Sequence, residues 1–407
     1  MFRFVYIKKR LLAFLFCVPH NRSDTNSPYQ AKGWCLAMNE MTYDALKKKL
    51  LITLHETPGI GWHTIKKAVD AELWAYEREL DAASFAAVGF RKDQAAIAAR
   101  RWNERAEERS EADYRQLGAV RITILDEEYP DLLKEIPQPP WVLYAMGRIE
   151  LLRRPAIAVV GTRQPTAYGR HAAGQLARDL AASGLTIVSG MARGIDSRAH
   201  EAALEEEGGT IAVLGTSIET IYPRENHSLY RSLKQKGLLV SEYPLGTPSR
   251  PGMFPQRNRI IAGLSLGTLV IEAAAGSGSL ITADQALDMQ RDVFAVPGPI
   301  NSPKSSATNG LIKQGAKLVA GSGDIMEEYR FMLGACGGTG VRKAEEALET
   351  FSKEEAEIYR LLQNSPHTAD ELHELSGMPF GLLHSVLINL SIKRKIEQQS
   401  GSIYMAL

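Results

Sequence analysis

Six short runs rich in β-branched and apolar residues alternate with helix-length stretches between residues 156 and 296, and this pattern constrains the fold most. Such continuous apolar runs are typical of strands buried on both faces of a sheet. The stretches between them include predicted helices at Tyr168–Ser183 and Ile195–Glu207. Alternation of this kind predicts an α/β fold with a doubly wound, mostly parallel sheet. The predicted strands are Ala156–Val160, Thr186–Ser189, Thr210–Leu214, Leu238–Glu242, Thr268–Glu272 and Val293–Val296.

The chain is long enough for more than one folded unit. At 407 residues we expect two or three domains, because single cores stop growing at about 250–300 residues. We predict a leader, an all-α domain, a connector, the α/β domain, a linker and a small tail domain. Their predicted bounds are 1–40, 41–110, 111–150, 151–322, 323–349 and 350–407, in that order.

The overall charge is close to zero, with 48 basic and 47 acidic residues. This balance argues against a protein that coats duplex DNA over its whole surface, and it is compatible with a local basic site. The three cysteines form no CxxC pair, so we expect neither a zinc site nor a redox dithiol. With no metal-ligand spacing and no paired carboxylates, we expect a cytoplasmic protein without metal, cofactor or catalytic residues.

The leader begins MFRFVYIKKRLLAFLFCVPH, and its apolar run Leu11–Val18 is too short to span a bilayer. It resembles a weak signal peptide that lacks a cleavage site. The alternative is an upstream start codon, with Met38 or Met41 as the true beginning. No later segment is apolar enough to cross a membrane, so we expect no membrane association.

Two glycines interrupt the amphipathic helical pattern that precedes residue 110. Pro58-Gly59-Ile60-Gly61 separates two apolar-periodic stretches, and a weaker turn follows at Val88-Gly89-Phe90. The first turn resembles a helix-hairpin-helix, in a SAM-like domain, which holds DNA phosphates through its backbone N–H groups. A plain packing unit of two helices is the alternative.

The tail combines two helices with a strand pair. We predict one helix from Thr368, a turn at Ser376-Gly377, a second helix from Pro379, and strands within Ile396–Met405. This order is typical of a winged helix. The second helix offers only His384, Ser385 and Asn389 for reading bases, so we favour a protein-contact or structural role over duplex recognition.

The segment Pro244–Gly263, PLGTPSRPGMFPQRNRIIAG, contains three arginines and no acid. Arginine forks match phosphate oxygens, and an aromatic face can stack on a base. We expect a helix to begin near Arg257, so that its first turn carries cations that await an anion. Phe254 could instead belong to the core. The predicted DNA contacts here are Arg250, Phe254, Arg257, Asn258 and Arg259.

A second acid-free stretch, Leu151–Arg178, contains the loop GTRQPTAYGR after the first predicted strand. Gly161, Thr162 and Arg163 lie at the carboxyl end of that strand, where ligands of doubly wound sheets bind. A bidentate phosphate contact is the expected role of Arg163. The alternative is an arginine that caps a helix C-terminus.

Two further loops also follow predicted strands. In SGMARGID we expect Ser189, Gly190, Arg193 and Gly194 to face an anion, while the next acid, Asp196, caps the helix. In AAAGSGSLITAD the candidate contacts are Ser277, Gly278 and Ser279.

Fingerprints of other functions are absent from this region. Neither a G-x-G-x-x-G with a distant acid nor a G-K-[ST] loop occurs, so dinucleotide or ATP binding lacks its usual pattern. Gly263–Gly267 matches G-x-S-x-G, but a helix precedes it and a strand follows, which is the reverse of a hydrolase elbow.

Residues Pro155–Ala320 resemble the DprA/Smf family of bacterial DNA-processing proteins. The matching stretches include IAVVGTRQPTAYGR, LTIVSGMARGIDSRAH, IYPRENHSLY and SEYPLGTPSRPGMFPQRNRIIAG. The resemblance implies a non-catalytic, Rossmann-like domain that binds single-stranded DNA and forms a homodimer. It also implies loading of the RecA recombinase onto strands held by single-strand binding protein during natural transformation. One departure is LGTSIETIYP, with Ser217 and Glu219 where the family has glycine and aspartate.

An enzymatic alternative is also open. GLSLGTLVIEA is loosely similar to the PGGxGTxxE motif of lysine-decarboxylase-like phosphoribohydrolases, which places Glu272 at their catalytic glutamate. The paired glycines of that motif are missing, because Leu264 and Ser265 follow Gly263.

Overall fold

The computed structural model describes residues 43–75, 80–335, 352–364, 367–392, 395–399 and 403–406. The predicted leader, 1–40, lies outside these ranges, as do residues 336–349 of the predicted linker. The first part of that linker is helical, since α14 (Ser322–Ala335) continues the α/β domain. Within the described ranges, no helix is both long and apolar enough to span a bilayer.

Nine strands form one sheet, in the order β1-β2-β6-β5-β4-β3-β7-β8-β9. The seven strands from β3 to β9 run parallel, and the order reverses beside β3, as in a doubly wound fold. This confirms the predicted fold class. The strands are β1 (Val120–Thr123), β2 (Val142–Gly147), β3 (Ala156–Val160), β4 (Thr186–Ser189), β5 (Thr210–Val213), β6 (Leu238–Ser241), β7 (Gly267–Val270), β8 (Asp292–Ala295) and β9 (Lys317–Leu318).

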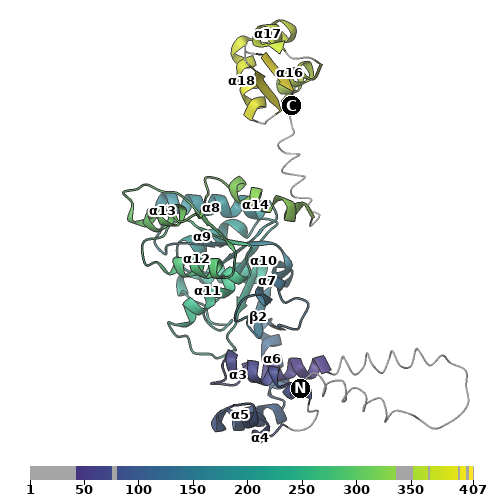
Figure 1. The fold of residues 1–407 in the computed structure, drawn as a ribbon, viewed down its shortest axis with the longest axis vertical. Coiled ribbons are helices and arrows are strands. Elements are labelled where there is room, and N and C mark those ends of the chain that lie inside the picture. Colours follow the sequence, from purple (N-terminus) through teal and green to yellow (C-terminus); the bar gives the residue numbers. More distant parts are fainter. Residues whose placement is uncertain are drawn as a thin grey trace, which may run out of the picture.

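Helices cover both faces of this sheet (Figure 1). Ile157 and Val159 of β3 point into a core with α8, α9 and α14, whereas Ala158 and Val160 point into a core with α7, α11, α12 and α13. Successive side chains of a strand face opposite sides, so β3 supplies both layers. The helices are α7 (Asp131–Lys134), α8 (Ala167–Ala182), α9 (Ile195–Ala203), α10 (His227–Lys236), α11 (Met253–Gly263), α12 (Gly278–Asp288) and α13 (Ser306–Lys313).

The predicted connector contributes two strands to the sheet. β2 pairs antiparallel with β6, and β1 pairs antiparallel with β2. The sheet therefore begins at Val120 and not at the predicted boundary of residue 151. The prolines between the two strands misled the prediction, because they occupy the turn region around α7, where no ladder hydrogen bond is required.

The N-terminal region is helical, as predicted. A helix over residues 43–55 is followed by α3 (Trp62–Asp70), η1 (Leu73–Ala75), α4 (Ala82–Ala87), α5 (Lys92–Asn103) and α6 (Ala106–Leu117). Gly59 and Gly89 both have positive φ, at 81° and 90°, so each predicted turn uses a glycine in the left-handed region. Side chains of this region share a core with Tyr144 of β2 and Leu233 of α10.

The C-terminal domain contains α16 (Lys353–Asn364), β10 (His367–Thr368), α17 (Ala369–Ser376), α18 (Phe380–Ile392), β11 (Ile396–Gln399) and β12 (Ile403–Ala406). Thr368 caps α17 and Gly377 ends it in the left-handed conformation, which explains the predicted turn. The strands pair in the order β10-β12-β11. The prediction missed α16 and the short β10.

Candidate nucleic-acid interface

Loops at the carboxyl ends of β3, β4 and β5 meet the beginning of α11 around a small hollow. Five predicted contact residues line it, namely Arg163, Gly190, Arg193, Phe254 and Arg257. Three of the four predicted loops therefore come together. The sequence interpretation missed the other lining residues, which are Ala192, Gly215, Tyr222 and Pro223.

Arg163 is exposed on the loop between β3 and α8. Across the described ranges, its guanidinium makes no hydrogen bond or ion pair with another residue. Because the loop precedes the N-terminus of α8, the alternative role of capping a helix C-terminus is excluded for this helix. The charge of Arg163 is close enough to Arg257 to lower the pKa of that second guanidinium. The side chain is thus a free cation beside another cation.

Close backbone packing fixes the loop that carries Arg163. Gly194 has φ +83°, and a Cβ there would lie 2.5 Å from the Thr162 carbonyl oxygen, so only glycine fits. A Cβ at Gly161 would lie 2.7 Å from Cγ1 of Ile195. The Ile195 N–H donates to the Thr162 carbonyl at 3.2 Å. Gly161 and Gly194 thus allow the loop after β3 to pack closely against the loop after β4.

Arg257 is buried, with 6% of its surface exposed, and forms the floor of the hollow. The expectation that its helix begins there was wrong, because α11 begins at Met253 and Arg257 lies in its second turn. Nη1 donates to the carbonyls of Gly190 and of Val213, the latter at 2.5 Å. Burial lowers the pKa of Arg257, and the nearby Asp196 carboxylate opposes that shift.

Two buried side chains of α9 shape the loop after β4. Asp196 was expected to cap α9, but its carboxylate accepts from the N–H groups of Gly190 at 3.1 Å and Ala192 at 3.3 Å. Burial raises the pKa of Asp196. Nε2 of His200 accepts from the Met191 N–H at 3.3 Å, and burial lowers the pKa of His200 to about 3. The histidine is therefore a neutral structural group.

Two predicted contact residues are engaged inside the fold. Ser189 is fully buried, and its Oγ donates to the Val159 carbonyl at 2.6 Å. Asn258 is 9% exposed, and its Nδ2 donates to the Gly278 carbonyl at 3.4 Å. These two side chains hold neighbouring elements together, so the structure does not place them where a strand could reach them.

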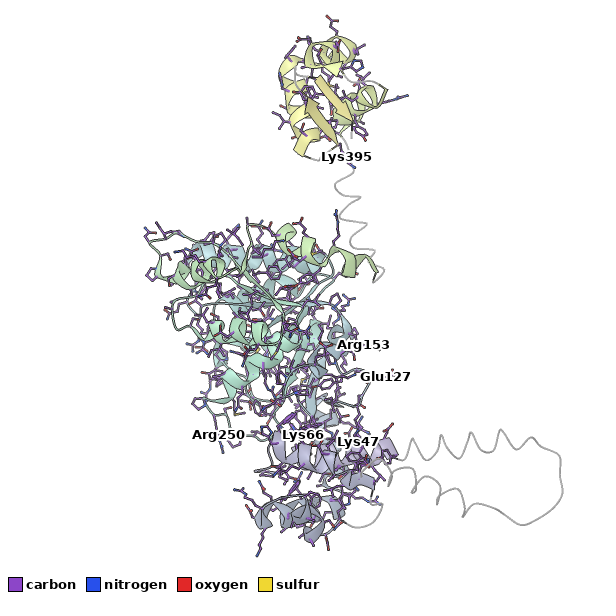
Figure 2. All side chains as sticks on the ribbon, in the orientation of Figure 1. Lys47, Lys66, Glu127, Arg153, Arg250 and Lys395 are labelled. Atoms are coloured by element: carbon purple, nitrogen blue, oxygen red, sulfur yellow. The ribbon has the colours of Figure 1, made fainter. Side chains whose placement is uncertain are left out.

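The two other arginines of the acid-free segment lie in different surroundings. Arg259 is paired with Glu242, with 2.5 Å between Nη2 and Oε1. Glu242 precedes the acid-free segment by one residue, Tyr243, so the sequence window concealed this partner. Arg250 is exposed at the surface, outside the lining of the hollow (Figure 2). Because α11 begins at Met253, Arg257 and Arg259 lie beyond its first turn, and the expectation of two cations in that turn was wrong.

The loop after β7 contributes no lining residue to the hollow. Ser277 caps α12, since its Oγ accepts from the Ser279 N–H at 3.4 Å. Ser279 is buried, while Gly278 is exposed. Ser277 thus serves as the cap of this helix.

Two aromatic rings stand together at the rim of the hollow. The Phe254 ring is 4.8 Å from that of Tyr222, at an interplanar angle of 43°. Tyr222 is 49% exposed and Phe254 is half-buried. A Cβ at Gly215 would lie 2.6 Å from Cδ1 of Phe254, so this ring packs directly on the backbone. Tyr222 lies in the stretch IYPREN, which is part of the family resemblance. Its position beside Phe254 depends on tertiary structure and could not be predicted from the sequence.

Arg193 forms an exposed ion pair with Glu225, at 2.6 Å. Both side chains are about 60% exposed, so the pair contributes little to stability. A phosphate group can compete with Glu225 for this guanidinium at small cost.

Glu272 follows β7 and is 2% exposed. Its carboxylate accepts from the Thr166 N–H at 2.8 Å and from the Thr166 Oγ–H at 2.6 Å. A general base or nucleophile has to reach its substrate, and this carboxylate is enclosed, with each oxygen accepting a hydrogen bond from Thr166. In the described ranges, no group of three or more His, Cys, Asp or Glu side chains could hold a metal ion.

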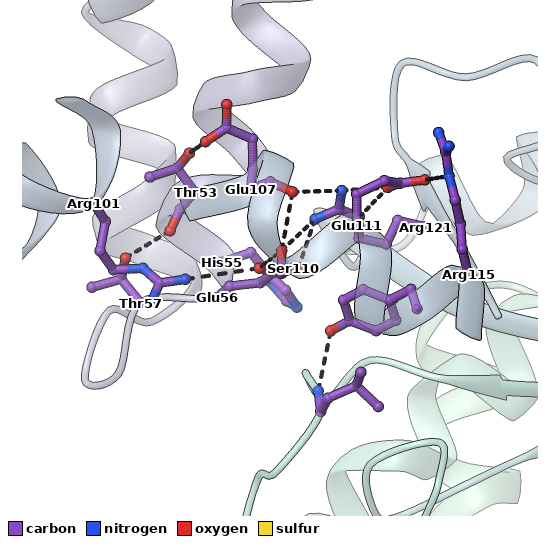
Figure 3. A network of polar contacts seen from close by, with 12 residues as sticks. Thr53, His55, Glu56, Thr57, Arg101, Glu107, Ser110, Glu111, Arg115 and Arg121 are labelled. Atoms are coloured by element: carbon purple, nitrogen blue, oxygen red, sulfur yellow. Dashed lines mark hydrogen bonds and ion pairs between the residues drawn. The ribbon is translucent and has the colours of Figure 1, made fainter. Parts of the chain in front are cut away.

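A polar network joins the helical region to β1 (Figure 3). The side chain of Arg121 in β1 is 6% exposed and pairs with Glu56 at 3.1 Å and with Glu111. Burial of paired, hydrogen-bonded charges fixes the orientation of the partners. The first helix therefore has a defined position against the sheet.

The same region contacts the arginine segment. The Leu245 N–H donates to Oη of Tyr114 at 3.1 Å, and Nε2 of His55 lies 2.8 Å from the Glu242 carbonyl oxygen. Gln94 of α5, the helix that follows the second turn, donates to the Gly59 carbonyl of the first turn at 2.6 Å. DNA binding by these turns stays a prediction.

These elements define a Rossmann-like α/β protein with a basic, aromatic-rimmed hollow at the carboxyl edge of its sheet. The family model described as DNA recombination-mediator protein A matches residues 120–330, and the model for the DprA winged helix domain matches residues 342–402. The chain belongs to the DprA/Smf family.

Individual relatives agree with this assignment. Protein Smf of Synechocystis sp. is 35% identical over 326 residues, which cover 72% of this chain and 81% of that protein. DNA processing protein DprA of Bacillus subtilis is 44% identical over 218 residues, covering 53% and 73%. The crystal structure of DprA from Streptococcus pneumoniae matches with a TM-score of 0.57 and 36% identity, covering 70% of this chain and 97% of that one.

Proposed function

We propose that this chain binds single-stranded DNA in the hollow and acts in DNA processing. The observation that carries the proposal is the pairing of a free, exposed arginine, Arg163, with the exposed aromatic ring of Tyr222 across one hollow. Arginine contacts the backbone phosphate, and the aromatic rings of the rim stack on bases that a duplex would keep paired. Membership of a family whose relatives are named DNA processing proteins supports the same role.

The test is an anisotropy titration of the full chain with a fluorescent oligothymidylate at several salt concentrations. We expect Arg163→Ala to weaken binding and to reduce the slope of log affinity against log salt by about one phosphate contact. Arg231→Ala, which removes an exposed arginine of α10, is the matched control. Unchanged affinity and slope in Arg163→Ala would reject the hollow as the binding site.

The finer role is part of the proposal. We infer that the protein is a homodimer that loads RecA onto strands held by single-strand binding protein, during transformation and homologous recombination. A direct test measures RecA-dependent ATP hydrolysis on single strands coated with single-strand binding protein. Acceleration by this chain, lost in Arg163→Ala, supports loading. The absence of acceleration by a chain that binds the strand would refute it.

We further propose that the protein is not an enzyme. The alternative, a nucleotide-phosphate hydrolase that uses Glu272, is disfavoured because both carboxylate oxygens are engaged and buried. Incubation with nucleoside monophosphates tests it. Release of free base that disappears in Glu272→Ala would overturn the binding-only proposal.

A further inference from the structure

Glu272 occupies the place where doubly wound sheets hold phosphate. Strand order reverses between β3 and β7, and ligands of such sheets bind at the carboxyl ends of the strands on either side of that reversal. A bound phosphate there meets the N-terminus of the helix that follows the first strand, which here is α8. In this protein the N-terminus of α8 receives the carboxylate of Glu272.

The contact is closely fitted on the helix side. Thr166, the N-cap of α8, donates to Oε2 through its N–H and to Oε1 through its Oγ–H. A Cβ at Gly169 would lie 2.3 Å from Oε2, so glycine at this position lets the carboxylate approach the first helical turn. Negative charge is favoured at this end of a helix.

No cation among the residues that the structure describes neutralises this buried carboxylate. Among the described residues, Glu272 forms no ion pair with Lys, Arg or His, although it is 2% exposed. Compensation comes from the helix N-terminus and the Thr166 hydroxyl, which are the groups that would otherwise hold an oxyanion.

Glu272 also holds the arginine-bearing loop at both ends. Its carbonyl accepts from the Thr162 N–H at 2.7 Å, and its carboxylate accepts from Thr166. Arg163 lies between these two contacts, in the span 162–166. Glu272 thus bonds both ends of the span from which Arg163 projects, in addition to the Ile195 N–H, which donates to the Thr162 carbonyl, and Lys304, which donates to the Gln164 carbonyl.

We propose that Glu272 is a built-in anion that determines specificity: it fills the phosphate position of the switch point and positions Arg163 for an external strand phosphate. The inference rests on the proposed function. It predicts that the wild-type protein does not bind free phosphate or mononucleotides at the N-terminus of α8. The phosphates of a DNA strand bind beside Arg163 instead, outside the position that Glu272 fills.

The experiment compares wild type, Glu272→Ala and Glu272→Gln as full chains whose folding is verified by circular dichroism. Inorganic phosphate and AMP are titrated by isothermal calorimetry, and oligothymidylate by anisotropy, with and without formate. We expect no phosphate or AMP binding by wild type, and millimolar or tighter binding of both by Glu272→Ala. We expect its strand affinity to fall about tenfold and to recover at least threefold with formate, which can replace the carboxylate.

Glu272→Gln keeps the volume of the side chain and removes its charge, so it tests positioning even if the alanine variant does not fold. We expect a severalfold loss of strand affinity, no formate rescue, and no phosphate binding. The proposal is overturned if folded Glu272→Ala binds neither phosphate nor AMP, or if Glu272→Gln has wild-type strand affinity. If wild type itself fails to bind the strand, the proposed function fails, and the phosphate titration still decides whether Glu272 blocks an anion site.

Discussion

We expect that replacing Arg257 by alanine lowers the stability of the fold around the hollow. The same change at Arg163 should leave the stability almost unchanged. The guanidinium of Arg257 is enclosed, bonded to the carbonyls of Gly190 and Val213, and close to the buried Asp196 carboxylate. Alanine removes all of these interactions at once. The exposed Arg163 makes no comparable contact within the described residues.

The magnitude follows from the groups that are left behind. Removing one partner of a buried, charge-compensated pair costs about 3–5 kcal/mol, because an uncompensated charge stays buried. The two carbonyls that lose a donor are included in the same loss, since both accept from one guanidinium, and the buried Asp196 carboxylate loses the nearby positive charge. We expect Arg257→Ala to lower the free energy of unfolding by about 3–5 kcal/mol, and Arg163→Ala by less than about 0.5 kcal/mol.

Urea titration of both full-length variants measures this difference, and strand binding is then measured only where the protein is folded. Arg257→Lys is the matched control, because an ammonium keeps the charge but cannot reach two carbonyls and the carboxylate in the same way. If the free energy of unfolding of Arg257→Ala lies within about 1 kcal/mol of the wild-type value, the conclusion that Arg257 stabilises the fold as a buried cation is refuted.

Two further predictions concern the base contacts and pH. Tyr222→Ala and Phe254→Ala should each weaken oligothymidylate binding by about 1–3 kcal/mol per stacked base, while Tyr222→Phe stays close to wild type; equal loss in Tyr222→Phe would point to the hydroxyl instead. Because the pKa of His200 is about 3 when folded and about 6.5 when unfolded, the unfolded state binds the extra proton. Stability should fall as pH drops below about 6.5, by up to about 1.4 kcal/mol per pH unit, and His200→Gln should show a smaller slope in urea titrations from pH 7 to 5.

The strands β3 to β8 were predictable because each is a short and mostly buried run rich in apolar and β-branched residues. β3 and β4 have the predicted bounds, and the other four predicted strands, β5 to β8, end one or two residues earlier than predicted. Three strands were missed, namely β1, an antiparallel edge strand, β2, an internal antiparallel strand that follows prolines, and β9, an edge strand of two residues.

The candidate site was predictable at the level of loops and not of individual side chains. Sequence spacing places Arg163 and Arg257 at the same edge of a sheet, but it gives no information on burial. Arg257 proved to be an internal cation, and Arg259 has a partner, Glu242, outside the acid-free window. Tyr222 reaches the hollow from the loop after β5, and only the folded chain shows that it meets Phe254.

The contacts between the helical region and the arginine segment affect the cost of binding. Tyr114 and His55 hold residues 242–245 in place before any ligand arrives. Ordering a loose loop on binding costs about 0.5–1.5 kcal/mol per immobilised side chain, and that entropy is already lost here when the chain folds. The N-terminal helices thereby preorganise the segment that leads into the arginine segment. We expect the affinity for single-stranded DNA to depend on the folding of these helices, even if they make no DNA contact of their own.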